Sequence, residues 1–455
     1  MGSSRALCLT TFFKASAAAE RAAPVARAAA AAIDGIGAPH RVLILAPHGS
    51  YRLAPFVNAA AALELAVVVG SESRFALGTL GAQAVRVDFD QPDGVLDRLL
   101  AMHRAAPFVA VVGTDDVSTE LAALVSERLG LPHNPVDSTR IARRKDLARE
   151  RLAARGVRVP AYRFLDRRQD LKAQITGLGF PVVAKPVALS ASRGVIRADD
   201  PASLAAAVRR IGMLLNETRD PTEASRILVE RFIPGSEVAL EGLLYRGRLQ
   251  VLAVFDKPEP LNGPYFEETY YITPSSLDQG QQKALRETVQ AACEAYGLRE
   301  GPVHAECRIN GEGVWILEVA ARTIGGSCAR LLQSGLGMSL ESLVLRHAMG
   351  RRVDHHQLLG AAGVLMIPIP QAGVLKRVEG VLAAERVPGI EEVRIEVREG
   401  YELVPLPDGS SYLGFIFARA DTATQAEQAL RRAHACLNVV VQPLWKLDAV
   451  GDRKY

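Results

Sequence analysis

Cysteine is scarce in this sequence, and the few cysteines present are poorly placed for cross-linking. Among 455 residues there are five, at widely separated positions: Cys8, Cys293, Cys307, Cys328 and Cys436. An odd number with no CxxC pair excludes a disulfide framework and offers no zinc-binding pattern. We therefore expect a protein of a reducing compartment, the cytoplasm.

Long apolar runs and an excess of one charge are also missing. The longest apolar candidate, residues 59–69, is interrupted by Glu64 and is shorter than the roughly 20 residues of a membrane helix. A net charge of +4, from 54 basic and 50 acidic residues, is too small to favour nucleic acid or an anionic membrane. We expect a soluble protein that binds small molecules, and neither nucleic acid nor membranes.

What is present is a globular composition with alternating strands and helices. Residues 1–40 are rich in alanine and mildly basic, which imitates a targeting segment but favours a weakly helical extension. Beyond them, strands are expected at 42–47, 65–70 and 109–116, with a helix at 53–65. This order predicts a parallel sheet. No GxGxxG motif follows the first strand, so dinucleotide binding is not supported.

The middle of the chain is expected to mix helices with antiparallel strands. Residues 138–158 hold eight basic side chains against two acidic ones, and we interpret them as a surface helix because aromatic stacking residues are absent. Helices are also predicted at 201–215 and 279–296. The long segment 257–275 has little periodicity, and such loops are usually functional. Strands are predicted at 180–186 and, as an antiparallel run, at 227–233, 237–245 and 248–256.

Residues 303–320 have the pattern of a β-hairpin that carries two glutamates. A three-residue loop would pair Asn310 with Val314 and would therefore set Glu306 opposite Glu318. The Cβ atoms of such a pair lie about 5 Å apart on one face of the sheet. Two opposed carboxylates repel each other unless a cation or a shared proton compensates.

The chemistry of this glutamate pair stays open on spacing alone. Two oxygen donors with free positions beside them suit Mg²⁺, which usually takes one or two carboxylates plus phosphate oxygens. A solvent-exposed hairpin face, or ion pairs with Arg308 and Arg322, explains the pattern equally well. His304 shares the face of Glu306, and a structural histidine is the favoured interpretation.

A second candidate site follows the apolar strand that ends at Lys185. A lysine in this position can direct a positive charge at a phosphate, and the next turn adds the hydroxyls of Ser190 and Ser192 beside Arg193 and Gly194. The loop matches no Walker pattern. Taken by itself, Lys185 is better explained as a surface lysine.

Taken in order, these motifs resemble the ATP-grasp superfamily, and most closely its L-amino-acid ligase group. The resemblance spans about residues 41–350 and includes a C-terminal segment similar to the small terminal domain of those ligases. It implies an ATP-grasp fold, of mixed α/β and α+β class, with a Rossmann-like pre-ATP-grasp lobe before it and a small α+β domain after it. The segments that carry it are 129–160, FPVVAKP (180–186), LVERFIPGSEVALEGL (228–243) and HAECRINGEGVWILEVAARTIGG (304–326).

The resemblance implies a nucleotide site. Lys145 and Lys185 would contact the ATP phosphates, with Lys185 also serving catalysis, and Glu237 would bind the ribose hydroxyls. Glu230 would lie at the adenine, beside a hinge strand. The remaining implied ATP contacts are the loop serines and the hinge residues: Ser190, Ser192, Arg231, Phe232 and Ile233.

The same resemblance implies a metal and catalytic site. Glu306 and Glu318 match the Mg²⁺ ligands, with Mn²⁺ as an alternative ion, which moves the hairpin interpretation toward a metal site. Arg322 matches the catalytic arginine that neutralises the transferred phosphate and the developing oxyanion, helped by the backbone of Gly325 and Gly326.

Substrate recognition and two departures from the family pattern complete the expectations. Glu267 and Glu268, in the segment FEETYY, would meet the ammonium group of an amino acid, although a surface acidic loop explains either residue nearly as well. Ala320 stands where the superfamily commonly has asparagine as a further metal ligand. Ala191 and Ser192 stand where glycines are frequent, which should stiffen the loop.

The expected activity is ATP-dependent ligation of a carboxylate to an amine, with small-molecule amino acids as substrates. An acyl phosphate would form first, and an amide or dipeptide, ADP and phosphate would result. Two alternatives stay open: an ATP-grasp carboxylase or formyl-transfer enzyme that uses bicarbonate or formate, and a nucleotide-binding module without turnover. A homodimer is compatible with the sequence. We divide the chain into an extension (1–40), a pre-ATP-grasp domain (41–137), an ATP-grasp domain (138–350) and a C-terminal domain (351–455).

Overall fold

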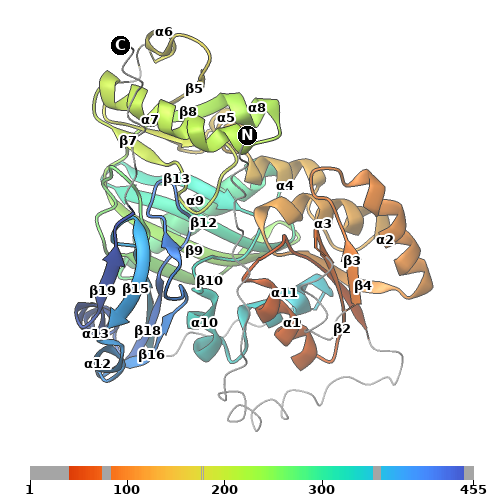
Figure 1. The fold of residues 1–455 in the computed structure, drawn as a ribbon. Coiled ribbons are helices and arrows are strands. Elements are labelled where there is room, and N and C mark those ends of the chain that lie inside the picture. Colours follow the sequence, from red (N-terminus) through yellow and green to blue (C-terminus); the bar gives the residue numbers. More distant parts are fainter. Residues whose placement is uncertain (1–39, 74–82, 176, 178, 352–359, 445–455) are drawn as a thin grey trace, which may run out of the picture.

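The computed structural model describes residues 40–73, 83–175, 177, 179–351 and 360–444. Within these residues the chain forms four β-sheets with helices packed against them (Figure 1). The helical extension expected over residues 1–40 lies outside the described residues, except for its last residue. Among the described helices, none has both the length and the apolar character that a membrane crossing needs.

The N-terminal lobe is a four-stranded parallel sheet with the strand order β3-β2-β1-β4 (Figure 1, orange). The parallel sheet predicted from the strand–helix alternation is therefore confirmed. Its central strand β1 is buried because it is built from valine, isoleucine and leucine. The elements of the lobe are β1 (Arg41–Leu45), α1 (Leu53–Ala62), β2 (Ala66–Ser71), β3 (Gln83–Arg86), α2 (Asp93–Ala105), β4 (Phe108–Gly113) and α3 (Asp116–Leu129).

Two helices, α4 (Val136–Arg143) and α5 (Lys145–Ala154), connect this lobe to the rest of the chain. The sequence predicted one surface helix over 138–158, and this prediction is wrong because the backbone of Arg144 is extended and ends the first helix. The break puts Lys145 at the start of α5. Ile141 of α4 and Leu152 of α5 are buried in the core.

A small lid module follows, with an antiparallel sheet in the order β5-β8-β6-β7 (Figure 1, top). The strand predicted at 227–233 is present as β8, but it pairs with β5 and β6 and not with the strands that follow it in sequence. The module contains β5 (Tyr162–Asp166), α6 (Leu171–Gln174), β6 (Val182–Pro186), β7 (Ile196–Ala198), α7 (Pro201–Leu214), the 3₁₀ helix η3 (Leu215–Glu217), α8 (Pro221–Ser225) and β8 (Arg226–Arg231).

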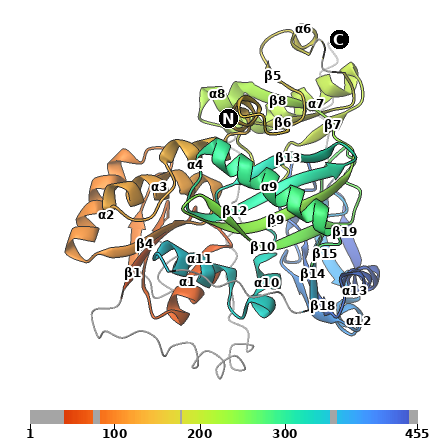
Figure 2. The ribbon, with the colours of Figure 1, turned by 180° about the vertical axis from the view of Figure 1, so that it is seen from behind.

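The largest sheet has eight strands in the order β13-β12-β9-β10-β11-β14-β18-β16. Helix α9 crosses the back of its first half (Figure 2), where Leu285, Val289 and Tyr296 pack against the strands. Strand β11 lies inside the segment predicted as an irregular loop, and it joins the two halves of the sheet. The first half contains β9 (Ser236–Tyr245), β10 (Arg248–Lys257), β11 (Tyr270–Thr273), α9 (Gln279–Tyr296), β12 (Gly301–Asn310), β13 (Gly313–Ala320), α10 (Ala329–Leu336) and α11 (Leu340–Ala348).

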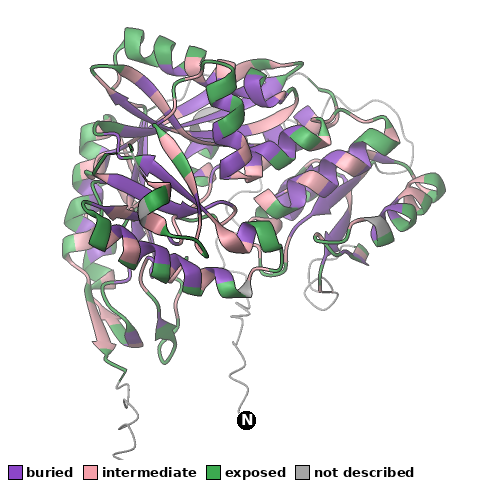
Figure 3. Cartoon of the chain, turned by 90° about the horizontal axis from the view of Figure 1, so that it is seen from above, coloured by how far each residue is buried: buried purple, intermediate pink, exposed green. Residues whose placement is uncertain are grey.

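The C-terminal part continues the large sheet and adds a three-stranded sheet of order β17-β15-β19 (Figure 1, blue). The division we propose at residue 350 therefore falls between neighbouring strands of one sheet. From above, the strands are largely buried and the outer helix faces are exposed (Figure 3). The elements are β14 (Ala361–Ile367), β15 (Gly373–Glu379), α12 (Val381–Glu385), β16 (Ile390–Ile395), β17 (Glu402–Leu403), β18 (Gly414–Ala420), α13 (Ala423–Ala435) and β19 (Asn438–Gln442).

Candidate active site

A large cavity lies where the N-terminal lobe, the lid module, the large sheet and the C-terminal part meet. Its volume is about 2440 Å³, well above the roughly 300–1,000 Å³ of a pocket for one small ligand. Of the residues to which the resemblance assigns a role, all but Glu267 line it. The chain thus brings the predicted site together from segments that are far apart in sequence, in a space large enough for several ligands.

The hairpin of β12 and β13 sets Glu306 opposite Glu318, as the sequence predicted. The predicted turn length and the predicted regular pairing are both wrong, and the two errors cancel at Glu306. The turn has two residues, so that Asn310 pairs with Gly313 and not with Val314. A register shift between Glu306 and Cys307 then adds one residue to β13 and restores the predicted glutamate pair.

Two lysines from different elements line the cavity. Lys145, at the start of α5, lies 3.1 Å from the carboxylate of Glu318 and donates a hydrogen bond of 2.9 Å to the carbonyl of Leu189. Lys185, in β6, forms an ion pair with Glu230. Burial lowers the pKa of Lys185 despite this partner. Both lysines are buried against the cavity, which suits the predicted contacts with phosphates.

Glu230 pairs with two cations, Lys185 and Arg149. One of its oxygens forms the ion pair with Lys185, and the other accepts a hydrogen bond from Arg149. Arg149 is a buried side chain of α5 that also donates to the carbonyl of Leu317 at 2.5 Å. Burial alone would raise the pKa of Glu230, but Arg149 and Lys185 outweigh it and lower the pKa to about 2. The contact with adenine stays a prediction; the geometry gives Glu230 the additional task of holding Lys185.

We expect Glu230→Gln to destabilise the protein by about 2 kcal/mol at pH 7, because it leaves two buried cations without a carboxylate. A carboxyl whose pKa falls on folding stabilises the protein above its unfolded pKa, and this contribution is lost as pH falls toward the folded value. The difference from wild type should therefore shrink between pH 4.5 and pH 2, the ordinary and the folded pKa of Glu230. Urea unfolding across this range measures it, with the exposed Glu150→Gln as control. A difference that does not change with pH would contradict the ion-pair assignment.

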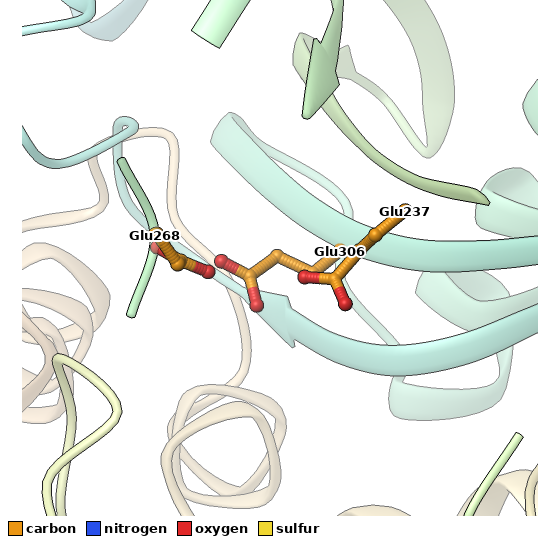
Figure 4. A group of neighbouring side chains, drawn as sticks. All are labelled: Glu237, Glu268 and Glu306. Carbon is orange, nitrogen blue, oxygen red and sulfur yellow. The ribbon is translucent and has the colours of Figure 1, made fainter. Parts of the chain in front are cut away.

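Lys257, at the end of β10, joins three carboxylates into one cluster. Its ammonium lies 3.0 Å from Glu237, 2.5 Å from Glu268 and 3.4 Å from Glu306. Figure 4 shows Glu306 between the other two glutamates, and one oxygen of each lies within 4.8 Å of the others. Such a set of carboxylate oxygens matches the ligand preference of a hard cation.

Within this cluster, the pKa of Glu268 and the pKa of Glu306 are shifted in opposite directions. Burial and the charge of Glu306 raise the pKa of Glu268 to about 7. Burial also opposes ionisation of Glu306, but Lys257 and His304 hold its pKa well below the ordinary value. The second oxygen of Glu268 accepts a hydrogen bond of 2.7 Å from the hydroxyl of Tyr271.

The hinge and ribose candidates are held by a buried arginine. Arg308 donates to a Glu237 oxygen at 3.0 Å and to the carbonyl of Ile233 at 2.7 Å. Its guanidinium also lies 4.9 Å from the ring centre of Phe232. Arg231 and Phe232 donate their backbone N–H groups to the lid module. Each oxygen of Glu237 retains a lone pair for a ribose hydroxyl, a role that stays a prediction.

The loop after β13 carries the predicted catalytic arginine. Arg322 is buried, and its Nε lies 3.0 Å from Asp116 of the N-terminal lobe. Gly325 and Gly326 follow in the cavity wall, where the N–H of Gly326 donates to the hydroxyl of Tyr51 at 3.1 Å. Ala320 is buried opposite His304 at the end of β13, so a methyl group stands where the resemblance would place asparagine.

His304 bridges two acidic side chains on the floor of the cavity. Its two ring nitrogens lie 3.4 Å from Glu241 and 3.5 Å from Glu306. Glu241 is fully buried and accepts hydrogen bonds from the backbone N–H of Ile324. His304 is thus buried between two carboxylates, and it connects the hairpin to the loop after β13. Its structural role stays a prediction, because it also lines the cavity.

The lid loop, residues 187–195, is attached to the C-terminal part. Gly194 donates to the carbonyl of Pro407 at 3.0 Å, and Arg193 donates to the carbonyl of Asp408 at 3.1 Å. Ala191 and Ser192 adopt the left-handed backbone conformation, with φ of 56° and 54°, which is costly for residues other than glycine. The departure noted in the sequence therefore falls at positions where glycine would relieve strain.

Sequence reasoning missed several residues of the site. Lys257, Arg149, Glu241 and Asp116 bind candidate residues directly, but none of them belongs to a local pattern that signals this. Conversely, the carboxyl of Glu267 accepts a hydrogen bond from the backbone of Ile369 and does not line the cavity. The geometry brings Glu268, and not Glu267, to the site.

Comparison with known proteins agrees with this architecture. Three domain families match the chain: the ATP-grasp N-terminal domain at 57–133, the ATP-grasp domain at 178–330 and the L-amino acid ligase C-terminal domain 2 at 365–442. An L-amino acid ligase from Bacillus licheniformis has a similar structure, with a TM-score of 0.77 and 26% identity. The similarity covers 89% of this chain and 99% of that one.

Two curated enzymes are similar over part of their length. Alanine–anticapsin ligase of Bacillus subtilis is 24% identical over 275 residues, and dapdiamide A synthase of Enterobacter agglomerans is 26% identical over 251 residues. These alignments cover 57% and 54% of this chain, and 58% of each enzyme. With its matched domains in the order of an ATP-grasp ligase, the chain belongs to the ATP-grasp superfamily, in the L-amino acid ligase group.

Proposed function

We propose that the protein joins the carboxylate of one amino acid to the amine of a second, at the expense of ATP. The observation that carries this function is the cavity in which Lys145, Lys185, Glu306, Glu318 and Arg322 converge under an L-amino acid ligase C-terminal domain. Members of the superfamily bind ATP with Mg²⁺, and the residues of this cavity fit both.

The charges of the cavity support a binding site for MgATP. Lys145 pairs with Glu318, Lys185 with Glu230, and Lys257 with Glu306. Phosphate oxygens would take over the lysines, while the carboxylates of Glu306 and Glu318 would hold Mg²⁺, whose ligand preference they match. When bound, Mg²⁺ would supply charge neutralisation at the β- and γ-phosphate oxygens.

The proposed reaction has two steps. The carboxylate oxygen of the first amino acid attacks the γ-phosphorus of ATP, the bond to the bridging oxygen breaks, and ADP leaves. The amine of the second amino acid then attacks the acyl carbon, loses a proton and expels phosphate. Arg322 and Lys185 stabilise the transferred phosphoryl group, so catalysis is largely electrostatic.

The acyl phosphate would hydrolyse if water reached it, so the cavity has to close. The lid loop is suited to this because Lys145 already binds the Leu189 carbonyl. Attachment of the same loop to the C-terminal part supports a closed position over the nucleotide.

Glu268 is the acidic residue we propose for the ammonium group of an amino acid substrate. It lines the cavity next to Glu306, whereas Glu267 does not.

We further propose a cytoplasmic protein, in keeping with the free thiols of Cys293, Cys307, Cys328 and Cys436. The domain division given above and a homodimeric assembly are also proposals.

The test is release of ADP from MgATP with pairs of amino acids, with bicarbonate and with formate. Release that requires two amino acids, together with an amide product found by mass spectrometry, is the expected result. Release that requires bicarbonate or formate would favour the carboxylase or formyl-transfer alternative. Tight binding of ATP without turnover would favour the nucleotide-binding module.

A further inference from the structure

The N-terminal lobe contacts the active site at a sequence that the proposed chemistry does not use. Strand β4 ends at Gly113, and the residues Thr114, Asp115 and Asp116 follow at the start of α3. Both aspartates line the cavity wall beside the loop that carries Arg322. Two adjacent acidic groups next to a predicted phosphate-binding arginine call for an explanation, because uncompensated they would repel phosphate.

Asp115 has its own partners within the lobe. Its carboxylate accepts hydrogen bonds from Arg52 at 2.7 Å and from the hydroxyls of Ser50 and Thr114 at 2.6 Å each. Its backbone N–H also donates a hydrogen bond of 3.1 Å to the hydroxyl of Ser118 at the start of α3. Asp115 is therefore committed to the structure of this turn.

Asp116 is directed at the active site instead. Its carboxylate lies 3.0 Å from Nε of Arg322. Burial alone would raise the pKa of Asp116, but Arg322 outweighs it and lowers that pKa, so the group is ionised at neutral pH. Asp116 belongs to the N-terminal lobe, and its carboxylate is the charged partner of Arg322 in the loop after β13.

The guanidinium of Arg322 is held from two sides. Nε faces Asp116, and one terminal nitrogen donates to the carbonyl of Thr323 at 3.1 Å. A guanidinium is planar, so fixing two of its nitrogens also fixes the direction of the third. The side chain lines the cavity, which is where a phosphoryl group would receive the remaining N–H donors.

The contact belongs to a broader junction between the lobe and this loop. The hydroxyl of Tyr51 accepts a hydrogen bond from Gly326, and a Cβ on Gly325 would lie 3.0 Å from the guanidinium of Arg52. The lobe therefore contacts the loop at both ends, at Arg322 and at the two glycines. A side chain on Gly325 would disturb this junction.

We propose, on the basis of the ligase function proposed above, that Asp116 is a positioning residue that orients Arg322 toward the transferred phosphoryl group. The catalytic arginine is then assembled across two lobes, and it has its working geometry only when the N-terminal lobe is docked on the large sheet. Asp116 contacts no reacting atom in this scheme and acts through Arg322.

The test is a double-mutant cycle with Asp116→Asn and Arg322→Gln, read on two measurements. The first is retention of MgADP with aluminium fluoride, which mimics the transferred phosphoryl group and needs no amino acid. The second is kcat and KM for ATP. Loss of a residue that orients a ligating group typically costs about 10- to 100-fold. We expect losses of this size in aluminium fluoride-dependent retention and in kcat, with KM for ATP changed less than about threefold.

The cycle distinguishes positioning from a structural role. In the Arg322→Gln background, Asp116→Asn should add less than about a threefold further loss, because residues that act as a unit are not additive. Asp116→Glu keeps the charge and should recover part of kcat, whereas damage to α3 would affect both variants equally. The matched control is Asp137→Asn. It removes an exposed aspartate in the first turn of α4, which pairs with Arg140 further along the same helix.

Each outcome has a defined meaning. Any of three results would overturn the positioning role. They are wild-type values of MgADP retention and kcat in Asp116→Asn, losses that multiply in the double variant, and no retention of MgADP with aluminium fluoride by the wild type. If the cycle behaves as expected on aluminium fluoride while no pair of amino acids releases ADP, the positioning role stands and the proposed ligase function fails.

Discussion

Replacement of Glu318 by glutamine is expected to lower kcat for ADP release by about two to three orders of magnitude, the cost of losing one electrostatic group at a reacting centre. Glu318 faces Glu306 across the hairpin and is the partner of Lys145. Glutamine keeps the size of the side chain and one acceptor oxygen, but it removes the charge that would hold Mg²⁺ against the phosphates. The protein should remain folded, because Glu318 is only partly buried.

The measurement is ADP release over a range of Mg²⁺ concentrations. Glu318→Gln should need more Mg²⁺ for half-maximal rate as well as losing kcat, since weaker metal binding affects both. Glu312→Gln, in the exposed turn of the same hairpin, is the matched control and should behave as the wild type. Full activity of Glu318→Gln at ordinary Mg²⁺ would remove Glu318 from the metal site.

The glutamate pair was predictable because strand pairing follows from local pattern. Alternating residues over 303–320 predict a hairpin, and the hairpin predicts which residues face each other. The turn length was wrong by one residue, and a register shift beside Glu306 corrected the error. The extra residue lies in β13, since β12 keeps an unbroken register with β9, and no turn or glycine signal in the hairpin sequence marks it.

Contacts between distant segments were less predictable. Lys257 ends a strand that was predicted nearly to the residue, but its three carboxylate partners come from β9, β12 and the segment before β11. Asp116 meets Arg322 only because the N-terminal lobe packs against the loop after β13. No local periodicity carries such information, since it depends on how lobes are docked.

The strand β8 illustrates the same limit within one element. Its apolar residues correctly predict a buried strand at 227–233, and adjacency in sequence suggested pairing with the strand that follows. The structure pairs it with β5 and β6, so that Glu230 lies beside Lys185 in the lid module. The family resemblance supplied the role of Glu230 at the nucleotide, but the cation that holds it became apparent only from this pairing.

Replacement of Lys257 by methionine is expected to destabilise the protein by about 3–5 kcal/mol, the cost of removing one partner from a buried ionic group. The side chain of Lys257 is 2% exposed, and its ammonium is the shared cation of Glu237, Glu268 and Glu306. Methionine fills a similar volume, so the loss is electrostatic and leaves little cavity. Urea unfolding at pH 7 measures the effect. Lys283→Met, at an exposed position of α9, is the control and should change stability little.

The destabilisation of Lys257→Met should depend on pH and on Mg²⁺ in defined directions. The pKa of Glu268 is already raised to about 7, and removal of the lysine raises it further. A carboxyl that binds its proton more tightly in the folded state makes stability fall as pH rises, until its folded pKa is passed. Wild type and variant share this loss up to about pH 7, where the wild-type Glu268 ionises, so the deficit of the variant should grow as pH rises above about 7. Mg²⁺ should restore part of the stability, because its proposed ligand Glu306 belongs to the cluster and a bound cation would replace the charge of the lysine. A deficit that neither pH nor Mg²⁺ changes would mean that Lys257 supports packing, and that the three glutamates do not bind a cation.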